Sequence, residues 1–141
     1  LATSAREAAE GACVVFLCLP ATADVEAVLF GPEGIADTLQ AGTVVVDTST
    51  IDPLATRDFA GRLAGRGITM LDAPVSGGQK GAVDGTLTCM VGGPNEALGT
   101  VRPFLAAMAT AIVHIGGSGA GQVAKACNQI CVSANLVGAS E

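Results

Sequence analysis

The sequence contains few aromatic and few basic residues. Tryptophan and tyrosine are absent from its 141 residues, and aromatic residues make up only 3%. Lysine and arginine number 7 against 13 aspartates and glutamates, which gives a net charge of −6. Proteins bind nucleic acids through clustered basic residues and bind single strands through aromatic stacking. Both absences therefore argue against a nucleic-acid partner.

Long hydrophobic runs and metal-ligand clusters are missing as well. The apolar run at 13–19 is far shorter than the ~20 residues of a membrane-spanning helix. The five cysteines form no CxxC pair, and His114 is the one histidine, so we expect no metal site. A G-x-S-x-G motif is also absent, which argues against a serine hydrolase. We interpret His114 as structural.

The cysteine usage and the chain ends bear on the compartment. We interpret the cysteines as reduced thiols packed as small hydrophobic residues, which indicates a reducing compartment such as the cytoplasm. The chain begins at Leu1 rather than Met and ends at Glu141 inside a helical pattern. We therefore expect a fragment of a longer protein. A mitochondrial location stays open because a targeting segment would precede Leu1.

The sequence does have a regular alternation of strand-like and helix-like segments. Short apolar runs predict strands over 13–19, 43–47, 68–71, 86–91 and 111–115. Helical spacing predicts helices over 4–11, 22–30, 54–64 and 94–107, a helical turn over 35–40, and a long helix from about 120. This order predicts an α/β fold with a parallel sheet and right-handed crossovers. Ligands bind such sheets beyond the carboxyl ends of the strands.

Small polar residues lie where the expected strands end and helices begin. Thr22 is expected to cap the helix over 22–30, and Asp52 or Thr50 to cap the helix that starts at 53. Asp47 and Asp72 each end a strand. We interpret both as caps rather than as a pair of catalytic carboxylates.

The most informative segment is Asp72-Ala73-Pro74-Val75-Ser76-Gly77-Gly78. It places one hydroxyl and two unobstructed backbone N–H groups directly after a strand. This combination suits the binding of a carboxylate. A glycine-rich turn with no ligand is the alternative, and the residues alone leave both readings open.

A second informative segment follows the glycine-rich run at 116–121. The run does not fit G-x-G-x-x-G and is a candidate linker. Lys125, one of only two lysines, lies among alanine, valine and cysteine. Burial there would lower its pKa and suit it to proton transfer, with Asn128 on the same helical face. A lysine that extends its charge into solvent is the alternative.

Taken in order, these segments resemble the β-hydroxyacid dehydrogenase family, which includes 3-hydroxyisobutyrate dehydrogenase and tartronate semialdehyde reductase. The resemblance runs from Val14 to about Leu136. Its most specific part is 72–78 together with the glycine-rich stretch up to 93. The pattern Gly119-x-Gly121-x-x-x-Lys125-x-x-Asn128 resembles the segment that carries the family's catalytic lysine.

The resemblance implies hydride transfer between NAD or NADP and a small 3-hydroxy acid or its semialdehyde, without a metal. Lys125 would be the general acid/base. The substrate-binding residues would be Ser76, Gly77, Gly78, Asn128 and Gln129. The cofactor-binding residues would be Leu19, Pro20, Asp24 and Thr50. The Asn-Gln pair at 128–129 is more like the tartronate semialdehyde reductase branch.

The resemblance also implies a domain organisation. Residues 1–117 would form part of a Rossmann-type NAD(P)-binding domain without its first βαβ unit, which carries the G-x-G-x-x-G loop. NAD and NADP are therefore not distinguished. Residues 118–141 would begin, with a long interdomain helix, the all-helical C-terminal domain. We expect a homo-oligomer in the full-length protein, and no activity from the fragment alone.

Three alternatives to this dehydrogenase stay open. They are a non-catalytic NAD(P)-binding scaffold, an imine-reducing relative and a sugar-acid phosphate dehydrogenase. The presence of Lys125 argues against the first two. The scarcity of basic residues for phosphate contacts argues against the third.

Overall fold

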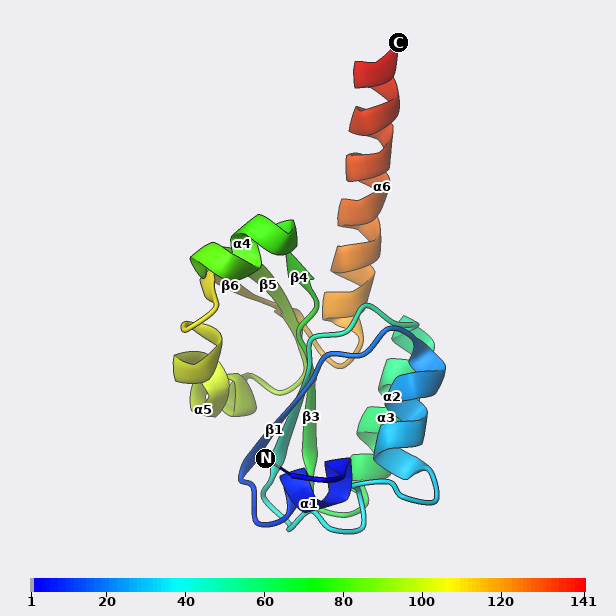
Figure 1. Ribbon diagram of the computed structural model, residues 1–141, viewed down its shortest axis with the longest axis vertical. Helices are drawn as coiled ribbons and strands as arrows, with labels where there is room; N and C mark the ends of the chain where they lie inside the picture. Colours follow the sequence, from blue (N-terminus) through cyan, green and yellow to red (C-terminus); the bar gives the residue numbers. More distant parts are fainter. Residues whose placement is uncertain (1) are drawn as a thin grey trace.

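A computed structural model describes residues 2–141 as a sheet covered by helices, with one long helix projecting from it (Figure 1). The strands are β1 (Val14–Leu17), β2 (Val44–Asp47), β3 (Thr69–Asp72), β4 (Val75–Ser76), β5 (Leu87–Gly92) and β6 (Ala109–Gly116). The helices are α1 (Ala5–Ala9), α2 (Thr22–Phe30), α3 (Pro53–Ala64), α4 (Gly78–Asp84), α5 (Asn95–Leu105) and α6 (Ala120–Ser140). The predicted α/β alternation and the long final helix are confirmed.

The sheet is mixed rather than parallel, so this part of the prediction is wrong. Strands β1, β2 and β3 are parallel neighbours. Strand β5 runs antiparallel to β3 and β4, and parallel to β6. A parallel pair needs a crossover of about a dozen residues or more. Strands β3 and β4 run in the same direction, and only the ten residues 77–86 lie between β4 and β5. This connection is too short for a crossover, so the chain returns antiparallel.

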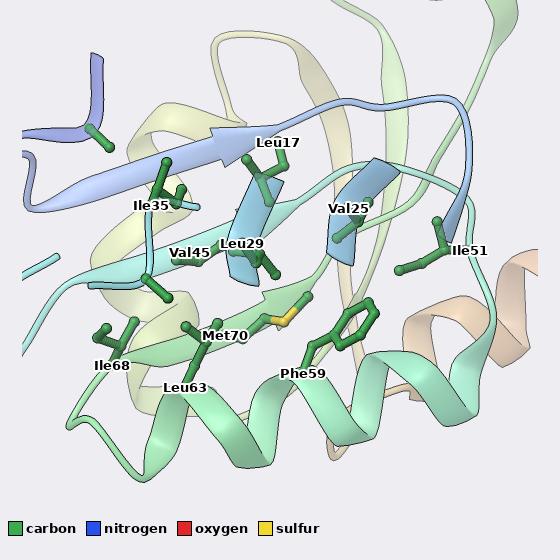
Figure 2. Close-up of a cluster of buried hydrophobic side chains, with 12 residues drawn as sticks. Leu17, Val25, Leu29, Ile35, Val45, Ile51, Phe59, Leu63, Ile68 and Met70 are labelled. Atoms are coloured by element: carbon green, nitrogen blue, oxygen red, sulfur yellow. The ribbon is translucent and has the colours of Figure 1, made fainter. Parts of the chain in front are cut away.

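The three parallel strands carry apolar side chains on both faces. Figure 2 shows the cluster on one face, where side chains from β1, β2 and β3 pack against α2 and α3. Its labelled members are Leu17, Val25, Leu29, Ile35, Val45, Ile51, Phe59, Leu63, Ile68 and Met70. On the other face, Val44, Val46 and Leu71 belong to a second cluster with Leu98 and Leu105 of α5. Burial on both faces explains the near-continuous apolar sequences of β2 and β3.

The helical turn expected over 35–40 is confirmed, since the N–H of Leu39 donates to the carbonyl oxygen of Ile35 at 3.2 Å. Two other predicted segments differ in the structure. The strand expected over 13–19 is shorter, and it is not buried on both faces, since Phe16 is 40% exposed. The glycine-rich stretch at 76–85 contains β4 and the helix α4. Its glycines delimit α4, because Gly77 precedes the helix and Gly85 ends it in the left-handed region.

The prediction of packed thiols is confirmed for one cysteine and wrong for four. Cys89 is fully buried in β5, and burial raises the pKa of its thiol to about 11. Cys13, Cys18, Cys127 and Cys131 are exposed free thiols. The last two lie on α6, which projects away from the sheet (Figure 1).

The segment at 116–121 is packed against the sheet and is not a linker. A Cβ atom on Gly121 would collide with the carbonyl oxygen of Met90. A Cβ atom on Gly92 would lie 2.5 Å from Oδ1 of Asp72. Glycine is therefore required where α6 meets β3 and β5. Within residues 2–141, no helix is long and apolar enough to cross a membrane.

The glycines of α6 allow a matched test of this close approach. We expect Gly121→Ala to lower the stability of the complete protein by about 1–3 kcal/mol, because the helix start must shift. Gly138 lies in the same helix, and an added Cβ there meets nothing within 4 Å. Gly138→Ala should therefore be neutral or slightly stabilising. Thermal unfolding of both variants checks this expectation, and equal melting temperatures would contradict it.

Candidate active site

The loops that follow β1 and β2 are joined at the carboxyl edge of the sheet. The backbone N–H of Leu19 donates to the Ser49 hydroxyl at 2.9 Å. The N–H of Asp52 donates to the Thr22 hydroxyl at 3.1 Å. The expectation that Thr22 caps α2 is therefore wrong, since Ala21 precedes the helix and makes no side-chain cap. Asp52 does cap α3, by accepting from the N–H of Leu54.

These two loops carry three of the four predicted cofactor-binding residues. Leu19 is partly buried, whereas Pro20 and Thr50 are exposed. Asp24 is exposed in the first turn of α2, directly after the first loop. The structure thus places the four residues along one edge, although they do not line the pocket that contains Lys125.

The predicted catalytic and substrate-binding residues meet at a different pocket, between β4, α4 and α6. This pocket has a volume of about 400 Å³, within the range of small-ligand sites. Its lining residues are Val75, Ser76, Gly77, Gly78, Ala82, Leu87, Lys125, Gln129 and Val132. The amide of Asn128 donates to the Ser76 hydroxyl at 3.3 Å. Segments about fifty residues apart in sequence therefore form one site.

The backbone at Gly77 and Gly78 requires glycine. Their φ angles are 134° and 60°, which residues with a side chain rarely adopt. A Cβ atom on Gly77 would also lie 3.0 Å from the Leu87 side chain. This wall of the pocket consequently presents peptide groups and the Ser76 hydroxyl rather than bulky side chains.

Lys125 lines the same pocket from α6 and is only 9% exposed. Burial lowers the pKa of its ammonium group. None of the ion pairs formed within residues 2–141 involves Lys125, whereas the other lysine, Lys80, pairs with Asp84. The reading of Lys125 as a solvent-extended lysine does not fit this burial. A desolvated amine in a small pocket is suited to proton transfer.

Asp72 holds the start of the helix that carries Lys125. One carboxylate oxygen accepts from the N–H of Gly119 at 2.8 Å, and the other accepts from the N–H of Gln122 at 3.0 Å. The expectation that Asp72 is a cap is thus confirmed. The helix that it caps begins about 47 residues further along the chain. His114 also has a structural contact, between Nε2 and the carbonyl oxygen of Gly93.

Sequence reasoning missed the role of the Gln122 side chain, which is buried and bonded to the loop after β2. The partners of this side chain are backbone groups of Ser49 and Ile51. Nothing in the local sequence indicates these partners. The one available signal was a glutamine surrounded by small apolar residues.

Asp47 is a second buried acid at this edge. Its Oδ1 accepts from the N–H of Ser49, and its Oδ2 has no hydrogen-bond partner within residues 2–141. Burial raises the pKa of Asp47, and the neighbouring Asp72 carboxylate adds to the shift. Asp47 holds the turn after β2 rather than capping a helix.

The known proteins that this chain is similar to are NAD-binding proteins and dehydrogenases. Residues 1–116 match the family described as the NAD binding domain of 6-phosphogluconate dehydrogenase. An NAD-dependent L-serine dehydrogenase of Pseudomonas aeruginosa is 46% identical over 140 residues, which cover 99% of this chain and 47% of that protein. A 3-hydroxyisobutyrate dehydrogenase of the same organism is 44% identical, with coverage of 99% and 47%.

A solved structure gives the same relationship in three dimensions. The Mycobacterium tuberculosis 3-hydroxyisobutyrate dehydrogenase with L-serine aligns at a TM-score of 0.87 and 39% identity, over 92% of this chain and 44% of that one. The chain spans about half the length of the curated relatives it matches. With most of its length inside the matched NAD-binding domain, the chain belongs to the β-hydroxyacid dehydrogenase family.

Proposed function

We propose that the complete protein transfers hydride between NAD or NADP and a small 3-hydroxy acid, with Lys125 as general acid/base. The observation that carries the proposal is that buried Lys125 lines one pocket together with Ser76, Gly77 and Gly78. The relatives named as dehydrogenases of L-serine and 3-hydroxyisobutyrate support this substrate class. Both of those molecules carry a hydroxyl group and a carboxylate.

Lys125 moves the proton in this proposal. The nicotinamide, when bound, supplies hydride chemistry. In the oxidation, the neutral amine of Lys125 accepts the hydroxyl proton while hydride leaves the carbon that bears this hydroxyl group. In the reduction, the ammonium of Lys125 returns that proton to the carbonyl oxygen. A lysine performs this transfer without placing a second negative charge beside the substrate carboxylate.

The other residues of the pocket bind and orient the substrate. The Ser76 hydroxyl and the peptide groups of Gly77 and Gly78 hold the carboxylate. Asn128 fixes the Ser76 hydroxyl through its amide, and Gln129 closes the pocket on the α6 side. These groups are neutral donors, so an anionic ligand is their natural partner.

The cofactor lies along the loops that follow β1 and β2, where Leu19, Pro20, Asp24 and Thr50 contact it. Ligands of Rossmann-type sheets bind at this carboxyl edge, and these loops expose Pro20 and Thr50 there. In the same proposal, residues 1–117 form the NAD(P)-binding part and 118–141 begin a helical domain. The complete protein is a homo-oligomer. A non-catalytic scaffold would not need a desolvated lysine.

The two lysines of the chain provide the test of the catalytic role. In the complete protein, we expect Lys125→Ala to reduce turnover by ~10²-fold or more while cofactor affinity is retained. Lys80→Ala is the matched control, because Lys80 lies exposed in α4 and pairs with Asp84. Reduced-nicotinamide absorbance is followed with NAD and NADP against 3-hydroxyisobutyrate, L-serine, glycerate and tartronate semialdehyde. Undiminished turnover in Lys125→Ala would exclude the proton-transfer role.

The pH dependence of turnover gives a second test. The oxidation needs the neutral amine, so kcat/KM should rise with pH through one ionisation. Because burial lowers the pKa of Lys125, that ionisation should lie below about 10.4, the ordinary value of a lysine. The reduction should lose activity across the same pH range. An identical ionisation in the residual activity of Lys125→Ala would assign it to another group.

Ser76 separates substrate binding from cofactor binding. We expect Ser76→Ala to raise the KM for the hydroxy acid by about 10-fold, the loss of one hydrogen bond to a charged group. Cofactor affinity should stay unchanged because the cofactor candidates lie outside this pocket. Steady-state kinetics and cofactor titration measure the two quantities. A selective loss of cofactor affinity would place this loop on the other ligand.

A further inference from the structure

Gln122 forms hydrogen bonds that the proposed catalytic and binding roles do not account for. Its carboxamide is only 1% exposed. The oxygen accepts from the N–H of Ile51 at 3.1 Å, and the nitrogen donates to the carbonyl oxygen of Ser49 at 2.8 Å. Its own backbone N–H donates to Asp72. One residue of α6 is therefore bonded to the loop after β2 and to the end of β3.

The segments that Gln122 joins belong to the two halves of the proposed site. Ser49 and Ile51 flank Thr50, which is exposed on the cofactor side. Lys125 follows Gln122 by three residues, about one helical turn further along α6. The side chain of Gln122 thus connects the cofactor-side loop to the helix that carries the proton-transfer group.

The buried part of α6 is its start. The buried residues of this 21-residue helix are Gly121, Gln122 and Lys125, all in its first turns. Asp72 bonds to backbone groups at this end of the helix. Within residues 2–141, two side chains of α6 form hydrogen bonds to other elements, Asn128 to β4 and Gln122 to the loop after β2. Gln122 is the one of the two that joins α6 to the cofactor-side loop.

We propose that Gln122 is a positioning residue, which fixes Lys125 relative to the cofactor-side loop through its bonds to Ser49 and Ile51. This inference rests on the proposed role of Lys125. Proton transfer concerted with hydride transfer needs both partners in a defined geometry. A misplacement of about 1 Å can cost ~10²-fold in rate. Loss of the Gln122 bonds should therefore lower kcat and leave binding largely intact.

The experiment uses Gln122→Met in the complete protein, because methionine keeps the volume and loses both side-chain bonds. We expect kcat to fall by at least about 10-fold, with the KM for the hydroxy acid and the cofactor affinity changed by about 2-fold or less. Leu98→Ala is the control, since Leu98 is buried in the α5 cluster outside the site. It should lower the melting temperature without changing kcat.

A second variant loosens the same turn without altering a side chain of α6. Asp72→Asn leaves one oxygen for the two N–H groups of Gly119 and Gln122, so the same fall in kcat with retained binding is expected. If both variants lower only the melting temperature and keep kcat, Gln122 is purely structural and the inference is overturned.

A double-mutant cycle tells whether Gln122 acts through Lys125. In a Lys125→Ala background, Gln122→Met should cause no further loss of kcat, because the group that it positions is gone. Losses that multiply would overturn the inference while leaving the catalytic role of Lys125 standing. Full activity of Lys125→Ala alone would overturn the proposed function instead, so the two failures are distinguishable.

Discussion

The arrangement of the site depends on the carboxylate of Asp72. It lies at the end of β3, is 1% exposed, and accepts two N–H groups from the first turn of α6. These N–H groups have no partner inside the helix and carry the positive end of its dipole. A buried carboxylate and an uncapped helix would each be unfavourable alone. Together they fix α6, and with it Lys125, to the strand that leads into Ser76.

This contact also explains the glycines that the sequence gathers at 92 and at 116–121. The carboxylate reaches the helix start only because Gly92 and Gly121 have no Cβ atom in the way. Within the run, Gly119 and Gly121 therefore serve helix docking. The spacing of its glycines already excluded the dinucleotide fingerprint, but spacing alone could not give the positive reason.

The sequence predicted what depends on local pattern. Short apolar runs gave five of the strands, and the segments at 72–78 and 119–128 gave the residues that meet in the pocket. What it missed depends on partners distant in the chain. The antiparallel pairing of β5, the bond from Asp52 to Thr22 and the bonds of Gln122 all join segments that no local pattern relates. Helix α4 was missed because glycine disfavours helices.

A buried carboxylate in an unfavourable environment, that of Asp47, also lies at the carboxyl edge of the sheet. Asp47 is buried beside Asp72, and one of its oxygens has no hydrogen-bond partner in the part of the chain that the structure describes. A raised carboxyl pKa means that the folded state holds its proton to higher pH than the unfolded state does. The contribution of Asp47 to the stability of the folded state therefore becomes less favourable as pH rises above about 3.9, the ordinary pKa of an aspartate. Such a cost is expected at functional positions rather than in an optimised core.

Lys80 and Lys125 show how environment assigns different roles to the same side chain. Lys80 is exposed and paired with Asp84, so its charge is stabilised by water and by a carboxylate. Lys125 is buried beside neutral groups, and burial lowers the pKa of its ammonium group. An anionic substrate in the pocket would supply the missing negative charge and raise that pKa again. Burial and substrate charge thus shift the pKa of Lys125 in opposite directions, which is how a site can tune a group for the proton transfer proposed for Lys125.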